Sequence, residues 1–126
     1  MSGTPPQLEV DLSSAVPPYE QIRAQVAGHV AAGALRAGDR LPTVRALAAD
    51  LGIAPGTVAR AYRTLEAEGV VVGRRRLGTV VTGPAAQVGS GVTRAAETLV
   101  RHAQDEGLSE AVVLDLVSGL LRSARA

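Results

Sequence analysis

The sequence predicts an α+β fold made of three N-terminal helices, a β-hairpin and two C-terminal helices. Along several stretches of the 126-residue chain, apolar residues recur at intervals of three and four, as they do on the buried face of a helix. After the third of these stretches, two short β-branched runs flank a basic turn, which is the pattern of a hairpin. Aromatic residues make up only 2% of the chain, with no Phe or Trp, so the core must be built from Ala, Val and Leu.

The N-terminal part of the chain is expected to hold a short strand and a long helix. Residues 8–12 alternate apolar and acidic side chains, which predicts an edge strand. The first helix opens at Pro17-Pro18 and ends at Gly33, a residue that commonly interrupts helices. Its predicted buried face consists of Tyr19, Ile22, Val26 and Val30.

Two further helices are predicted on either side of a tight turn. Thr43 is a suitable N-cap for the first of them, and Gly52 suits its C-terminal end because glycine adopts a left-handed backbone at little cost. The second helix runs from about Pro55 to Glu68 and stops at Gly69. Two helices joined by so short a turn form the helix-turn-helix pattern. The side chains predicted to point inward are Leu47, Ala48, Leu51, Val58, Ala61, Tyr62 and Leu65.

The chain after Gly69 has the period of a sheet. Residues 70–72 and 79–82 are β-branched runs, and they predict a hairpin whose turn spans residues 73–78. The tip of this hairpin carries Arg74, Arg75 and Arg76.

A linker is predicted to divide the chain into two parts. Residues 84–91 are rich in Gly, Ala and Ser, and they separate residues 7–83 from a helical tail over residues 92–126. The tail is expected to contain two helices, the first ended by Gly107 and the second capped by Ser109. This pair is too small and too apolar to bury its own faces, so it must pack on the first part or on another chain.

Positive charge is concentrated in the middle of the sequence. The net charge of the whole chain is +1, and all 13 basic residues are arginines. Residues 40–79 hold seven arginines against three acidic residues, a net charge of +4, whereas the segment from Pro84 onward has a net charge of −1. A basic middle segment is expected of a surface that faces phosphates.

Several function classes are disfavoured by what the sequence lacks. The absence of Cys excludes disulfides and thiolate metal sites and suits a reducing cytoplasm. No signal peptide and no run near the ~20 apolar residues of a membrane span are found, so we expect a cytoplasmic protein without a membrane partner. No phosphate loop, His-carboxylate metal spacing or nucleophile elbow occurs, so we expect neither an enzyme nor a bound metal or cofactor.

Three helices followed by a basic hairpin form the winged helix-turn-helix layout, which predicts binding to double-stranded DNA. The third helix fits the major groove, where its N-terminal amides can face a phosphate. Gly56 and Thr57 are small enough for close approach, and Arg60 can reach a guanine edge or a phosphate. Arg45 is placed to clamp the backbone or a groove. The wing arginines, Arg74, Arg75 and Arg76, can enter or straddle a minor groove.

Other interpretations remain open on the residues alone. Arg63 is an additional candidate for DNA contact, but Glu66 or Asp50 could pair with it instead. The arginines could also be solvated charges on a structural three-helix domain, or the winged helix could be an adaptor for another protein. Steep loss of binding with salt would separate a DNA site from a protein site, because phosphate contacts release counterions.

The most specific stretch of the sequence is Gly38-Asp39-Arg40-Leu41-Pro42-Thr43-Val44-Arg45. It is followed by Leu47-Ala48, Thr57-Val58, Leu65-Glu66 and Gly69. With these motifs, residues 17–81 resemble the DNA-binding domain of the GntR family of bacterial regulators. The Tyr19-Glu20-Gln21-Ile22 start and the short two-helix tail are similar to its YtrA-like short subfamily.

This resemblance implies a sequence-specific transcription regulator. It implies a repressor that binds a pseudo-palindromic operator as a homodimer, with its own operon as the target. DNA contacts fall on Arg45, Gly56, Thr57 and Arg60, and the helices of residues 92–126 form the dimer interface. The tail is too short for an ordinary ligand pocket, so no effector is assigned.

The chain departs from the family pattern in two places. The wing often reads Gly-x-Gly-Thr, whereas this chain has Arg76-Leu77-Gly78-Thr79, which keeps only the second glycine as a candidate for DNA contact, Gly78. The recognition helix opens with Ala54-Pro55-Gly56, where the subfamily often has Asn. Base-reading side chains are therefore fewer, and specificity depends more on Arg60, Thr57 and DNA shape.

Overall fold

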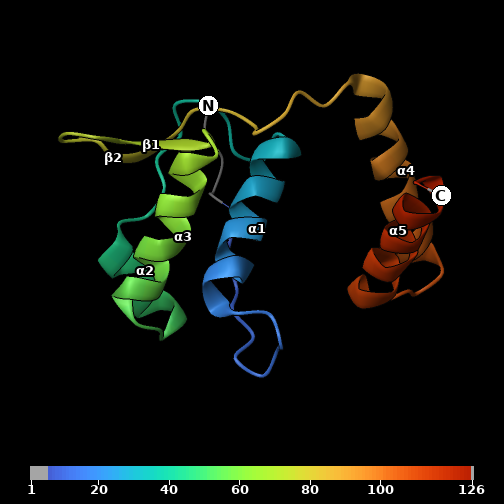
Figure 1. Cartoon of the computed structure of the whole chain (residues 1–126), viewed down its shortest axis with the longest axis horizontal. Helices are drawn as coiled ribbons and strands as arrows, with labels where there is room; N and C mark the ends of the chain where they lie inside the picture. Colours follow the sequence, from blue (N-terminus) through green and yellow to red (C-terminus); the bar gives the residue numbers. More distant parts are fainter. Residues whose placement is uncertain (1–5, 126) are drawn as a thin grey trace. The chain divides into compact units, whose positions relative to one another are not determined.

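The structure, a computed structural model, describes residues 6–125, which form five helices and one two-stranded sheet (Figure 1). This composition confirms the predicted α+β class, with a winged helix-turn-helix followed by a helical pair. The chain divides into two compact units, with the boundary between Gln87 and Val88. The elements are α1 (Pro18–Ala31), α2 (Val44–Leu51), α3 (Pro55–Ala67), β1 (Val71–Arg74), β2 (Gly78–Val81), α4 (Ser90–Asp105) and α5 (Glu110–Ala124).

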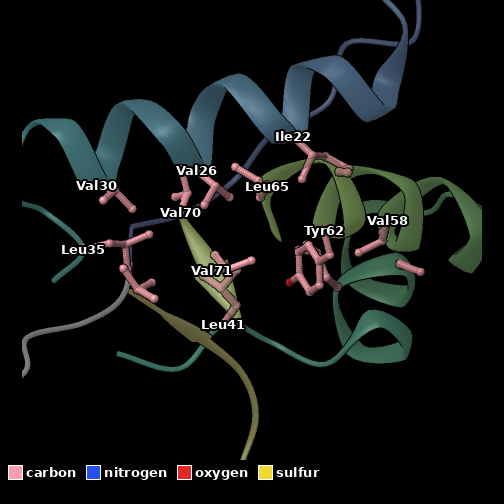
Figure 2. Packing of buried hydrophobic residues seen from close by; sticks show 14 residues of the cluster. Ile22, Val26, Val30, Leu35, Leu41, Val58, Tyr62, Leu65, Val70 and Val71 are labelled. Carbon is pink, nitrogen blue, oxygen red and sulfur yellow. The ribbon is translucent and has the colours of Figure 1, made fainter. Parts of the chain in front are cut away.

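The core of the first unit is aliphatic and lies between α1, α2, α3 and the hairpin (Figure 2). The predictions of buried side chains are confirmed on the three helices, with two exceptions. Tyr19 and Leu51 only pack against the edge of the core and stay half-buried. The largest fully buried side chains are Ile22, Val26, Val58, Leu65, Val70 and Val81.

The bend of the helix-turn-helix is built as predicted. The Thr43 hydroxyl accepts a hydrogen bond from the Ala46 N–H at 3.1 Å, which caps α2. Gly52 ends α2 with a φ of 67°, in the left-handed region. The Tyr62 hydroxyl donates to the Pro42 carbonyl at 2.7 Å and so ties α3 to the loop before α2. Burial raises the pKa of Tyr62, which keeps this hydroxyl protonated as a donor.

The predicted edge strand at residues 8–12 is wrong. This segment is extended, but its backbone pairs with side chains of α1 instead of another strand. Gln25 accepts from the Glu9 N–H at 2.9 Å and donates to the Glu9 carbonyl at 2.6 Å. Gln21 does the same for Asp11, at 2.8 and 2.9 Å.

The spacing of the two glutamines explains why a helix can replace a strand here. Four residues of helix rise ~6 Å, and two residues of extended chain span ~6.6 Å, so Gln21 and Gln25 match alternate residues of the segment. The alternation of apolar and acidic side chains, which suggested a strand, reflects instead which side chains face the core. Leu8 and Val10 pack against the core, while Glu9 is exposed.

The hairpin is antiparallel, and its strand β2 forms backbone hydrogen bonds along both of its edges. Val71 pairs with Val81 and Arg74 with Gly78, so the turn contains three residues. On the other side of β2, the Gly38 N–H donates to the Val81 carbonyl at 2.8 Å, and the Val81 N–H donates to the Asp39 carbonyl at 2.8 Å. This pairing was not predicted from the sequence. The wing is thereby attached to the chain that leads into α2.

The second unit is a pair of helices with little buried surface. The Ser109 hydroxyl accepts from the Val112 N–H at 3.3 Å, which confirms the predicted N-cap of α5. Gly107 follows α4 with a φ of 70°. Among the described residues of this unit, only Ala103 is buried. The exposed large apolar side chains of this unit are Val88, Val92, Val100, Leu108, Val112, Leu114, Leu116, Leu120 and Leu121.

We predict that replacing Gln21 will release the N-terminal segment. Gln21→Ala removes three hydrogen bonds, two to Asp11 and one to the Val16 carbonyl. The free energy of unfolding should fall by roughly 1–2 kcal/mol, and the Asp11 amide should lose protection from hydrogen exchange. Gln104→Ala in α4 is the control, because that exposed side chain makes no hydrogen bond within residues 6–125. Equal effects of the two substitutions would contradict the pairing.

Candidate nucleic-acid interface

The predicted site residues of the helix-turn-helix lie at the start of α2 and on the outward face of α3. Arg45 is the second residue of α2, and its side chain is exposed. Gly56, Arg60 and Arg63 are exposed at spacings of four and three along α3, which places them on one side of that helix. Thr57 is half-buried beside them.

None of these arginines forms an ion pair with an acidic side chain of the described residues. Within residues 6–125, ion pairs are formed only by Arg23, which contacts Glu20 at 2.7 Å and Glu68 at 3.3 Å. Neither of the two alternative partners considered for Arg63, Glu66 and Asp50, pairs with it, and the Glu66 carboxylate accepts a hydrogen bond from the Gly73 N–H at 3.3 Å. That bond connects α3 to β1. The guanidinium groups on the outward face of α3 therefore keep their full positive charge toward solvent.

The wing presents the remaining arginines at its tip. Arg74 ends β1, Arg75 and Arg76 lie in the turn, and Gly78 begins β2; all four are exposed. Arg76 has a φ of 73°, and among the described residues it is the only non-glycine with a positive φ. A left-handed backbone costs a residue with a Cβ about 1–2 kcal/mol. Arg76 stands where the family pattern has its first glycine, and the wing keeps its turn there with a left-handed backbone. The arginine adds a positive charge at that position and lowers the stability of the fold.

In the first turn of α3, the Gly56 N–H has no capping acceptor. Ala54 occupies the N-cap position, and its side chain has no acceptor. Pro55 has no N–H, and the Thr57 N–H is directed to the Ala54 carbonyl at 3.0 Å. Helices α1 and α4 also begin without a side-chain cap, so the missing cap alone does not distinguish α3. Helix N-termini of this kind attract anions through their amides and their dipole.

One residue of the site was missed by the sequence reasoning, which assigned Tyr19 to the core. The guanidinium carbon of Arg60 lies 3.7 Å from the centroid of the Tyr19 ring, a cation–π contact between α3 and α1. The two residues are far apart in the chain, and no periodicity links them. Only the packing of the helices brings them together.

Neither a cluster of metal-ligating side chains nor a membrane-spanning helix is found in the described part of the chain. Between residues 6 and 125, no three His, Asp or Glu side chains are grouped so that they could ligate a metal ion. The helices described are also too short or too polar to traverse a bilayer.

The family of the chain follows from its sequence profile. The profile of bacterial regulatory proteins of the gntR family matches residues 18–81, from the start of α1 to the end of β2. The chain belongs to the GntR family. This membership confirms the predicted family. It also confirms the prediction that the protein is a transcription regulator and not an enzyme. The matched region contains the helix-turn-helix and the wing described above.

Two curated relatives of this GntR-family chain illustrate the match. The HTH-type transcriptional regulator Rv1152 of Mycobacterium tuberculosis is 52% identical over 75 residues, which cover 60% of this chain and 62% of that protein. The HTH-type transcriptional repressor YtrA of Bacillus subtilis is 39% identical over 75 residues, which cover 60% of this chain and 58% of that protein. The aligned region thus spans about three-fifths of the length of either relative.

Solved structures show the same fold. YtrA from Sulfolobus acidocaldarius, a GntR-family transcription factor, is 29% identical with a TM-score of 0.54, and the match covers 93% of this chain and 98% of that one. The DNA-binding domain of AraR, solved in complex with operator ORX1, is 22% identical with a TM-score of 0.54, covering 60% and 96%. The second likeness concerns the fold of the first unit.

We predict that relieving the wing backbone will stabilise this GntR-family protein. Arg76→Gly removes the Cβ that is unfavourable at a φ of 73° and should raise the free energy of unfolding by ~1 kcal/mol, measured by urea denaturation. Arg75→Gly removes the same charge from a residue without a positive φ, and it should lower stability by ~0.5–1 kcal/mol. Equal changes for both variants would show that Arg76 is not strained.

Proposed function

We propose that the chain binds double-stranded DNA in a sequence-specific manner, with α3 in the major groove and the wing on the adjacent backbone or minor groove. The observation that carries this proposal is the outward face of α3, where exposed Arg60 and Arg63 form no ion pair within residues 6–125 and the Gly56 N–H at the helix start has no capping side chain. Bases are read in the major groove by side chains that can form two hydrogen bonds at once, and Arg paired with guanine is the commonest such contact. Arg45, Gly56 and Thr57 would support the approach of α3 to the duplex.

The wing arginines would contribute affinity more than specificity. Arg74, Arg75 and Arg76 lie on or next to a turn, where long side chains can follow a phosphate backbone without a fixed register. Gly78 allows the backbone of the wing to come close to DNA. Phosphate contacts of this kind position a protein on the duplex but carry no sequence information directly.

The names of similar proteins support a repressor. The Bacillus subtilis relative is named a transcriptional repressor, and the AraR domain was solved on an operator. For this chain we propose the same class of action, in which the bound protein blocks access of RNA polymerase to a promoter. We propose its own operon as the target and the cytoplasm as its location, because that is where bacterial DNA is transcribed.

We further propose that α4 and α5 form a homodimer interface. Leu116 and Leu120 are 46% and 62% exposed at a spacing of four on α5, and Val112 continues the same stripe. Contiguous exposed apolar surface of this kind marks association sites in proteins that must remain in solution. A two-fold dimer would read a pseudo-palindromic operator and let two modest half-site contacts act together.

The proposed function is tested by titrating fluorescently labelled promoter DNA with the purified protein at two salt concentrations, with unrelated competitor DNA present. We expect binding that survives competitor and weakens steeply with salt, because released counterions drive phosphate contacts. A folded protein that binds no DNA at low salt would refute the proposal. In that case a winged helix that binds another protein would become the better interpretation.

We predict that two arginine substitutions will weaken binding in different ways. Arg60→Ala should cost roughly 1–3 kcal/mol on the operator and relax the base preference at one position, because it removes a base-edge contact. Arg75→Ala should weaken operator and unrelated DNA similarly and should reduce the slope of affinity against salt. Arg36→Ala, an exposed arginine outside α3, the wing, α4 and α5, is the control and should change neither. Unchanged operator affinity for Arg60→Ala would exclude α3 as the recognition helix in this orientation.

We predict that a charge in the apolar stripe of α5 will separate the dimer. The mass of one chain is 12.9 kDa, so light scattering should give twice that value for the unaltered protein. Leu120→Glu should give the mass of one chain, because two buried carboxylates would face each other across a two-fold axis. Leu12→Glu introduces the same change at a leucine of the N-terminal segment that is 70% exposed, and it should leave the mass unchanged. A monomeric unaltered protein would contradict the dimer.

A further inference from the structure

We propose that Tyr19 of α1 is a positioning residue for Arg60, so that base recognition depends on α1 as well as on α3. This inference rests on the proposed binding of DNA by α3. Its basis is the stacking of the Arg60 guanidinium over the Tyr19 ring, with 3.7 Å from the guanidinium carbon to the ring centroid. Tyr19 is the second residue of α1, and its ring is half-buried against the edge of the core. The platform is therefore fixed to the fold, while the arginine it holds is exposed.

Stacking leaves the hydrogen-bonding groups of Arg60 available. The five N–H donors of a guanidinium point outward within its plane, whereas a ring contacts its face. In the described part of the chain, the Arg60 side chain makes no hydrogen bond and no ion pair. Arg23 of α1 shows the opposite case, because Glu20 and Glu68 occupy its donors.

An aromatic partner also preserves the charge that DNA binding requires. A carboxylate in the place of Tyr19 would restrain Arg60 equally well, but it would neutralise the charge, occupy the donors and repel phosphates. The ring attracts the cation through its quadrupole and carries no net charge. The chain has only two aromatic residues, both tyrosines. Tyr62 packs in the core, and Tyr19 holds an arginine of the outward face of α3.

The restraint has a consequence for specificity. A free arginine has many rotamers, and most of them direct the guanidinium to phosphates as readily as to a base. Reading guanine requires two parallel hydrogen bonds in one orientation of the group. A ring that limits Arg60 to one orientation therefore favours the base contact over phosphate contacts, and it lowers the entropy lost on binding. We infer that loss of the ring lowers affinity for the operator while affinity for unrelated DNA stays the same.

The test compares Tyr19→Leu with Tyr19→Phe on operator and on unrelated DNA, each in the unaltered and the Arg60→Ala background. Tyr19→Leu should lower operator affinity by roughly three- to fivefold, the size of an exposed cation–π contact, with unrelated DNA changed less than twofold. Tyr19→Phe should keep operator affinity, because it keeps the ring. In the Arg60→Ala background, Tyr19→Leu should have no further effect.

Four results would overturn the inference. Equal losses on both DNAs would indicate a general structural role of Tyr19, and a persistent loss in the Arg60→Ala background would show independence from Arg60. A loss for Tyr19→Phe as large as for Tyr19→Leu would assign the effect to the hydroxyl. Unchanged operator affinity for Tyr19→Leu would show that the contact has no role in recognition.

The stack itself is measured without DNA, so that failure of this inference is distinguishable from failure of the proposed function. The Arg60 side-chain N–H signals should be shifted by the ring current in the NMR spectrum of the free protein. The shift should remain in Tyr19→Phe and disappear in Tyr19→Leu, and its absence from the unaltered protein would refute the contact. An unaltered protein that shows the shift but binds no DNA would refute the proposed function, and the positioning role with it.

Discussion

The packing of α1 against α3 is the contact on which the rest of the first unit depends. Ile22 and Val26 of α1 and Val58 and Leu65 of α3 are all completely buried in one cluster (Figure 2). Burial of each such side chain stabilises the fold by about 1.5–3 kcal/mol before conformational entropy is counted. Because this contact covers the inner face of α3, it leaves Gly56, Arg60 and Arg63 facing outward. The same packing brings the start of α1 close to Arg60 of α3, so that the Tyr19 ring contacts the Arg60 guanidinium.

The candidate interface is where the chain departs from the rules that favour stability. α3 begins at an alanine without a side-chain cap, a left-handed turn position is occupied by Arg76, and several arginines have no acidic partner within residues 6–125. Other positions of the helix-turn-helix obey these rules, as at Thr43 and Gly52, whereas α1 also begins without a side-chain cap. Natural proteins break local rules mainly at functional sites. The left-handed residue of the wing and the arginines of α3 without acidic partners agree with the proposed DNA-binding surface.

The second unit differs in kind from the first. α5 is capped by Ser109 and α4 is followed by Gly107 in the left-handed region, but the large apolar side chains of both helices remain exposed. A helical pair of this size cannot bury enough apolar surface to offset the entropy of ordering it. Its helices are therefore specified by local sequence, while its stability requires another surface. A second copy of the chain supplies one in the proposed homodimer.

Local sequence determined the elements of this protein, and the tertiary structure determined their partners. Helix periodicity, the Thr43 and Ser109 caps and the glycines at helix ends act over a few residues, so these features could be predicted from the sequence alone. Three pairings could not be predicted: Gln21 with Asp11, Glu66 with the wing, and Tyr19 with Arg60. Hydrogen bonds and ring stacking depend on distance in space, and residues remote in the chain meet only after the aliphatic core has packed.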